Sequence, residues 1–236
     1  MSVILRIDVD WSYQNRILNY ARVNQELFLA VDYLGYLKSC KKIVDDLNGR
    51  GIKASAFFQP ATVPNKKFAQ SLADMGHSVG LHAVHTKSYD SFLSDLNKIS
   101  KKFDGLVRGF TKHGSGTLKF SRRHDSFYDP ERYIEYAKKS GLKYFLGNRE
   151  KPMECGHIIN NILYFPSAFW LNRNYREDKF TVEWLIDESN NRDVVVLIHP
   201  EDITEGTLIM QREYERILGG VEKFKTIDEI IRTVEK

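Results

Sequence analysis

Short runs of apolar residues alternate along this chain with longer segments in which apolar residues recur every three or four positions. A short apolar run predicts a buried strand, and the longer spacing predicts an amphipathic helix. Strands are predicted at residues 3–10, 52–58, 106–111, 142–146, 158–165 and 194–198, and a further strand ends at residue 82. Helices are predicted at residues 33–48, 65–75, 91–103, 130–140, 181–189, 211–218 and 226–234. Because the two kinds of segment alternate from end to end, we expect a parallel α/β architecture with crossover helices.

The stretch at residues 11–32 interrupts this alternation, because it lacks clean periodicity, and we expect an irregular loop with a helix near residues 25–31. No linker or internal repeat divides the 236 residues, so the sequence predicts a single domain over residues 1–236. The apolar fraction of 42% and the charged fraction of 28% are those of an ordinary globular protein.

The net charge of +4 is mild, and the basic residues are spread along helix-like segments. A nucleic-acid interface would need them concentrated on one surface, so we expect no nucleic-acid partner. Two unrelated cysteines imply no disulfide framework. The first apolar run is too short for a signal peptide, and no run is long enough for a membrane span. We therefore expect a cytoplasmic protein without a membrane span, and the sequence gives no indication of oligomeric state.

Polar residues stand out where the predicted strands end: Asp8, Asp10, His82, His85 and His199. In an α/β barrel the C-terminal ends of the strands form one rim, where active sites are built. Asp8 and Asp10 are two residues apart, so in a strand they face the same side. Placing two carboxylates together is costly unless a cation or proton lies between them. The alternative is that Asp10 only caps the following turn.

One carboxylate and two imidazoles, with water at the remaining position, form a common hydrolytic metal site. Zinc is the default metal for such ligands, although they do not select it decisively. A second carboxylate can act as general base and a further histidine as general acid. Asp8 or Asp10 fits the base and His199 fits the acid, and the chemistry suits hydrolysis of an amide or ester.

Several stretches resemble motifs of the polysaccharide deacetylases, which form carbohydrate esterase family 4. The aspartate motif is matched by Arg6-Ile-Asp-Val-Asp10, in an Asp-x-Asp variant, and the histidine motif by Leu72-Ala-Asp-Met-Gly-His-Ser-Val-Gly-Leu-His82. Similar matches are found for a second strand at residues 51–58, a final histidine motif at residues 197–200 and a closing segment at residues 224–230. The resemblance implies a distorted (β/α) barrel, often seven-stranded, and metal-dependent removal of acetyl groups from N-acetylated sugars.

Carried over to this sequence, the resemblance makes Asp8 the catalytic base, Asp10 and His82 metal ligands, and His199 the general acid. Leu197 would help line the pocket for the acetyl methyl group. The family's second histidine usually follows the first by four residues, a position held here by Thr86. We expect His85, one residue earlier, to complete the metal shell, because residues three and four apart share a face of a helical turn.

The family also commonly has an arginine that orients the base, and Thr111 stands near its expected position. Lys112 or Arg108 are the candidate substitutes. His113 is expected to be a polar contact to the substrate, as is Lys112, and His113 and His124 are the alternative third ligands.

These departures keep two alternatives open: an enzyme that acts on another C–N bond, and a barrel that binds carbohydrate without metal catalysis. A metallophosphoesterase is weaker, because two-metal sites need more clustered carboxylates and histidines. Trp170 is expected to stack against a sugar ring, or else to pack under a loop. A cytoplasmic location favours a sugar nucleotide, a lipid-linked sugar or a surface-polysaccharide precursor as substrate.

Overall fold

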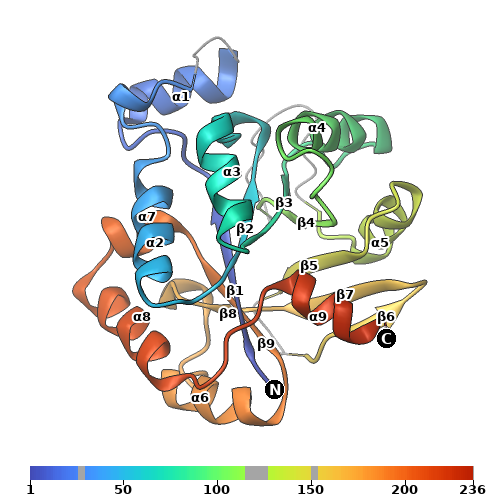
Figure 1. Cartoon of the computed structure of the whole chain (residues 1–236). Helices are drawn as coiled ribbons and strands as arrows, with labels where there is room; N and C mark the ends of the chain where they lie inside the picture. Colours follow the sequence, from blue (N-terminus) through green and yellow to red (C-terminus); the bar gives the residue numbers. More distant parts are fainter. Residues whose placement is uncertain (26–29, 115–126, 150–153, 236) are drawn as a thin grey trace.

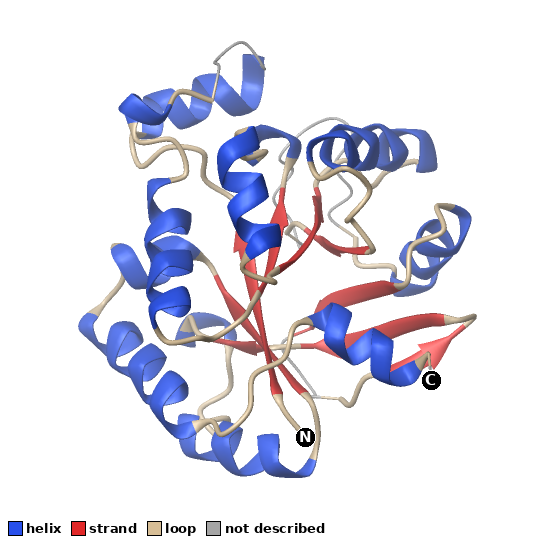
Figure 2. Ribbon diagram, in the orientation of Figure 1, coloured by secondary structure: helices blue, strands red, loops and turns tan. Residues whose placement is uncertain are grey.

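The computed structural model describes residues 1–25, 30–114, 127–149 and 154–235. Its centre is a curled sheet of nine strands in the order β6-β7-β5-β4-β3-β2-β1-β9-β8, with the helices arranged around the outside (Figures 1 and 2). The strands are β1 Val3–Val9, β2 Ser55–Phe58, β3 Ser78–Ala83, β4 Gly109–Lys112, β5 Tyr144–Arg149, β6 His157–Ile159, β7 Ile162–Ser167, β8 Phe169–Trp170 and β9 Val194–Ile198. This is the distorted (β/α) barrel that the sequence predicts.

Nine helices surround the sheet within the described residues: α1 Arg16–Gln25, α2 Lys38–Gly49, α3 Lys66–Asp74, α4 Tyr89–Lys102, α5 Pro130–Lys139, α6 Val182–Asn191, α7 Pro200–Thr204, α8 Leu208–Gly220 and α9 Ile227–Val234. Three short 3₁₀ turns are η1 Asp32–Leu34, η2 Pro60–Thr62 and η3 Arg173–Tyr175. None of the helices described is long and apolar enough to cross a membrane.

The strand count differs from the expected seven because two short strands extend the edges of the sheet. The apolar stretch predicted as one strand at residues 158–165 is in fact a hairpin, with β6 antiparallel to β7. Asn160 and Asn161 turn the chain with φ values of 53° and 65°, the left-handed conformation that a tight two-residue hairpin requires. At the other edge, the two residues of β8 pair in parallel with β9.

The first helices also begin elsewhere than predicted. The stretch expected to be mostly loop contains α1, and part of the helix expected near residues 25–31 lies outside the described residues. The helix predicted from residue 33 begins only at Lys38, because Leu37 adopts a left-handed conformation with φ 53°. A short 3₁₀ turn precedes it.

Alternate residues of each strand face the barrel interior, and this alternation determines which side chains reach the site. The residues of β1 at odd positions pack beneath the surrounding helices, whereas Ile4 belongs to a separate interior cluster with Phe57 and Tyr144. Glycines make room for these rings: a Cβ on Gly80 would lie 2.5 Å from Phe57, and one on Gly109 would lie 2.3 Å from Tyr144. Since side chains alternate with period two, Arg6 and Asp8 share the interior face with Ile4.

Candidate active site

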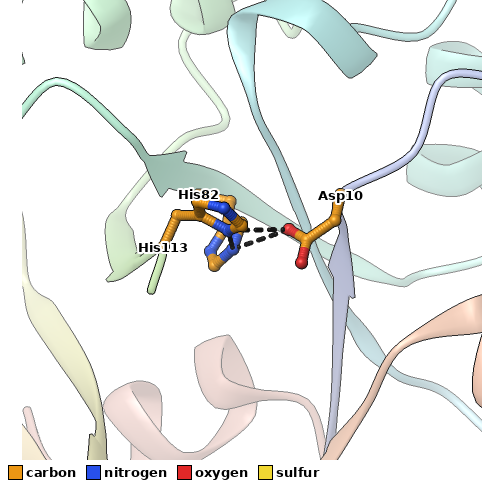
Figure 3. Close-up of side chains that lie close together, drawn as sticks. All are labelled: Asp10, His82 and His113. Carbon is orange, nitrogen blue, oxygen red and sulfur yellow. Dashed lines mark hydrogen bonds and ion pairs between the residues drawn. The ribbon is translucent and has the colours of Figure 1, made fainter. Parts of the chain in front are cut away.

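Three side chains of types that can bind a metal, Asp10, His82 and His113, converge at the C-terminal ends of β1, β3 and β4 (Figure 3). The Nε2 atom of His82 lies 2.9 Å from Oδ1 of Asp10 and 3.0 Å from Nδ1 of His113. The third side of this triangle, from His113 Nδ1 to Asp10 Oδ1, measures 3.1 Å. Zinc binds histidine nitrogen and carboxylate oxygen at about 2.0–2.2 Å, so one ion can reach all three atoms at once.

The hydrogen bonds around His82 show that this cluster fits a cation. Its Nδ1 lies 2.6 Å from the hydroxyl of Thr111, which in turn donates to Asp8 at 3.4 Å. Thr111 therefore accepts the Nδ1 proton and leaves the Nε2 lone pair directed at the carboxylate of Asp10. Burial lowers the pKa of His82, which favours this neutral form. A lone pair facing a carboxylate is unfavourable unless a cation lies between them.

The neighbours of Asp10 determine both its position and its charge. The side-chain amide of Gln59, which follows β2, donates to Oδ1 of Asp10 at 2.8 Å. Burial acts to raise the pKa of Asp10, but positive charge on His113 and His82, in their protonated forms, holds that pKa well below its ordinary value. Asp10 is therefore an ionised carboxylate, the form that binds a metal.

The structure places His113, and not His85, beside Asp10 and His82. Nδ1 of His85 lies 2.9 Å from Asp95, a buried residue of α4, and the backbone N–H of His85 donates to the same carboxylate at 3.1 Å. We expected His82 and His85 to share one face of a helical turn. The chain at His82 is instead an extended strand, β3, which ends at Ala83. Residues three apart in extended chain point to opposite sides. Thr86 is buried, and the other candidate ligand, His124, lies outside the described residues.

Asp8 lies deeper in the barrel and is paired with Arg6, two residues earlier on β1. The guanidinium donates to Asp8 from Nη2 at 2.5 Å and from Nε at 2.9 and 3.1 Å, and both side chains are almost completely buried. Burial acts to raise the pKa of Asp8, but Arg6 and the nearby His82 lower it below its ordinary value. Asp8 is therefore an ionised carboxylate that does not belong to the triangle of ligand atoms.

The two predicted substitutes for the orienting arginine make other contacts. Arg108 precedes β4, at the opposite end of the strand from His113, and pairs with Glu235 at 3.2 Å. Lys112 is buried, and its ammonium group donates to the backbone carbonyls of His113 and Gly114. The cation beside Asp8 is instead Arg6, which the sequence analysis did not consider.

His199 follows β9 and faces the cluster. Its Nε2 lies 3.5 Å from Oδ2 of Asp10, and its Nδ1 lies 3.3 Å from Oδ2 of Asp202. Burial acts to lower the pKa of His199, but Asp202, Asp10 and Asp8 together raise it to about 9. The imidazole is therefore protonated at neutral pH and can donate a proton into the site.

Two predicted substrate contacts lie near this histidine. Trp170 pairs with Leu197 in the β8–β9 register, and its ring centre lies 5.9 Å from that of His199. Leu197 is buried in the interior cluster, and the half-buried Trp170 also contacts the more exposed Tyr175. The roles of Trp170 and Leu197 in substrate binding stay predictions.

No known sequence family matches this chain, and no curated protein is significantly similar to it in sequence. Solved structures are similar to it in fold. A probable polysaccharide deacetylase from Pseudomonas aeruginosa superposes with a TM-score of 0.62 at 12% identity, over 98% of this chain and 89% of the other. The fold is that of the polysaccharide deacetylases.

Two further structures show how varied the chemistry on this fold is. An allantoinase also superposes with a TM-score of 0.62 at 12% identity, over 98% of this chain and 88% of its own. A carbohydrate esterase family 4 pseudoenzyme from Bacillus anthracis gives 0.51 at 16% identity, over 98% of this chain and 65% of its own. At these identities the likeness establishes the fold alone, so the activity must be argued from the residues of the site.

Proposed function

We propose that this protein is a metal-dependent hydrolase that removes an acetyl group from an N-acetylated sugar. The observation that carries the proposal is the meeting of two separate groups at one end of the barrel. Asp10, His82 and His113 offer three ligand atoms within 2.9–3.1 Å of one another, and Asp8 and His199 flank them without joining them.

The three ligand atoms would be Oδ1 of Asp10, Nε2 of His82 and Nδ1 of His113, and we propose zinc as the ion. When bound, such an ion polarises a carbonyl group and lowers the pKa of a coordinated water. Thr111 and Gln59 orient two of the ligands through their hydrogen bonds to His82 and Asp10. Partners of this kind are a regular feature of metal sites.

The remaining residues handle protons. Asp8, kept ionised by Arg6, can accept a proton from the attacking water as general base. His199, kept protonated by Asp202, can donate a proton to the nitrogen of the leaving amine as general acid. One carboxylate held as a base and one imidazole held as an acid are the two proton-transfer groups that amide hydrolysis needs.

Trp170 and Leu197 support a sugar substrate with a small acyl group. The indole of Trp170 beside His199 offers an aromatic face for the sugar ring, and buried Leu197 provides an apolar surface for the acetyl methyl. A sugar nucleotide, a lipid-linked sugar or a surface-polysaccharide precursor remains the substrate class we favour.

The proposal is tested by measuring acetate release from N-acetylglucosamine oligomers and from nucleotide-linked N-acetylglucosamine. The protein is assayed as purified, after chelation and after zinc is restored, with Asp10→Ala as the control. Activity that is lost on chelation, recovers with zinc and is absent from Asp10→Ala supports the proposal. Bound zinc without acetate release from any of these probes contradicts it and favours another C–N bond or a binding role.

A further inference from the structure

Helix α1, at the upper edge of the molecule in Figure 1, carries apolar side chains on the face turned toward solvent. A helix packed on a soluble protein normally shows the reverse. Ile17 is 79% exposed and Tyr20 is 70% exposed, and Val23, a further three residues along, is exposed as well. In the 3₁₀ turn η1, Tyr33 is 86% exposed and Leu34 is exposed beside it. These five residues are called the α1–η1 surface below.

Polar contacts attach α1 to the rim of the barrel. Arg22 donates from Nε to the backbone carbonyl of Ala61 at 3.0 Å, and its guanidinium lies over the ring of Tyr36, which follows η1. The hydroxyl of Ser12 donates to the same carbonyl at 2.8 Å. Since Ser12 is two residues from Asp10, the α1–η1 surface lies at the end of the barrel that holds the candidate active site.

Basic side chains border this surface. The acid of η1, Asp32, is paired with Lys41 at 2.5 Å and accepts from the side chain of Asn65 at 2.5 Å. Asn65 caps the start of α3, where the next two residues, Lys66 and Lys67, are both exposed. The surface therefore combines exposed apolar side chains with neighbouring positive charge.

We propose that the α1–η1 surface docks on an anionic membrane, so that the active site acts on a sugar linked to a lipid. Tyrosine suits the membrane interface because its ring is apolar and its hydroxyl is polar. Aliphatic side chains on one helix face enter the boundary of the acyl chains, and nearby lysines attract anionic headgroups. The choice of substrate rests on the proposed function, whereas the docking surface does not.

Two other occupants match the surface less well. A sugar polymer stacks on aromatic rings, but Ile17, Val23 and Leu34 are aliphatic. A second copy of this chain would place the same patch on both sides of a two-fold axis. The positive borders at Lys66 and Lys67 would then face each other, and like charges across an interface are unfavourable.

Vesicle binding tests the surface directly. Sedimentation is measured with phosphatidylcholine vesicles and with vesicles of phosphatidylcholine and phosphatidylglycerol in equal parts. Ile17→Ser should weaken binding to the anionic vesicles about 10-fold, the effect of losing one large buried apolar side chain. Ile158→Ser is the matched control and should bind like the parent, because Ile158 is 55% exposed on β6 at the end of the barrel where β7 begins.

The charge contribution is tested separately. Replacing Lys66 and Lys67 by glutamine should weaken binding to the anionic vesicles about 5-fold for each lysine and leave binding to phosphatidylcholine alone unchanged. Equal weakening on both kinds of vesicle would contradict attraction to anionic headgroups.

Activity separates a failure of docking from a failure of the proposed function. Acetate release is measured from a soluble N-acetylglucosamine oligomer and from lipid-linked N-acetylglucosamine in the anionic vesicles. Ile17→Ser should raise the KM for the vesicle substrate about 10-fold and leave kcat and KM for the oligomer unchanged. If the parent releases no acetate from either substrate, the proposed function fails and vesicle binding alone decides whether the surface docks.

Four results would overturn the docking proposal. The parent protein does not bind the anionic vesicles, or Ile17→Ser and Ile158→Ser lose binding equally. The KM for the soluble oligomer rises in Ile17→Ser, which would make the surface a sugar platform. A dimer of the parent, measured by analytical ultracentrifugation, dissociates in Ile17→Ser, which would make a second copy the occupant.

Discussion

Nδ1 of His113 lies 3.0 Å from Nε2 of His82, although His82 lies in β3, His113 follows β4, and the two are 31 residues apart. His85, only three residues from His82, is instead paired with Asp95. The third candidate ligand is thus supplied by the residue that follows the neighbouring strand β4. Neighbouring parallel strands end at the same rim of the barrel, so side chains from either strand can reach one site.

The first prediction follows from this geometry. His113→Ala should lower zinc affinity by more than the roughly 10–100-fold that loss of an outer hydrogen-bonding partner costs. His85→Ala should leave zinc affinity close to that of the parent protein, because His85 contacts Asp95 rather than the cluster. Calorimetric titration of the two variants measures the difference. A larger loss for His85→Ala than for His113→Ala would contradict the assignment.

Thr111 should act on the metal through His82. Its hydroxyl lies 2.6 Å from Nδ1 of His82 and fixes which ring nitrogen faces the cluster. Thr111→Val keeps the shape of the side chain but removes the acceptor, so zinc affinity should fall by about 10–100-fold. Thr111→Ser is the matched control, because it keeps the hydroxyl, and its affinity should stay near that of the parent. Equal affinities for the valine and serine variants would show that the hydrogen bond has no such role.

The pH profile of kcat should report His199. As a general acid His199 is active only while protonated, and its pKa of about 9 means that activity should persist through neutral pH and fall as pH rises through that value. Burial favours the neutral form of His199, whereas the carboxylate of Asp202 favours the protonated form and so raises the pKa of His199. Asp202→Asn should therefore move the alkaline fall in kcat to lower pH. An unchanged alkaline limb in this variant would exclude His199 as the titrating acid.

Zinc should stabilise the folded protein, because the three ligand atoms come together only when the strands are assembled. At a free zinc concentration 100 times its Kd, the expected gain in unfolding free energy is about 2.7 kcal/mol, seen as a rise in Tm. Asp10→Ala should show little of this rise. A similar rise in both proteins would place the stabilising zinc elsewhere.

The fold could be predicted from the sequence because the central parallel strands are short buried apolar runs, and strands such as β2 and β3 are each followed by an amphipathic helix, α3 and α4. Asp10, His82 and His199 were correctly expected at one rim for the same reason. The hairpin of β6 and β7 was missed, because its two turn residues, Asn160 and Asn161, were included in one apolar run.

The errors within the site have one physical origin, the two-residue period of the strands. Position 85 is an odd number of residues from His82 and leaves the interior face, whereas His113 is two residues from Thr111 and stays on it. Arg6 is likewise two residues from Asp8, and a lone arginine in an apolar strand was the signal that it pairs with a buried carboxylate. The contact of Gln59 with Asp10 depends on how the segments after β1 and β2 meet, which no local pattern indicates. The contact of Asp202 with His199 is local, because the two residues form the capping box at the start of α7.

The central claim is that one metal ion binds to Asp10, His82 and His113. Its most direct test is the position of the zinc anomalous-scattering peak in crystals of the zinc-loaded protein. We predict a single strong peak bonded to Oδ1 of Asp10, Nε2 of His82 and Nδ1 of His113, with Asp8 still bound to Arg6. A peak bonded to His85 or Asp8, or no peak between these three residues at saturating zinc, would contradict the account.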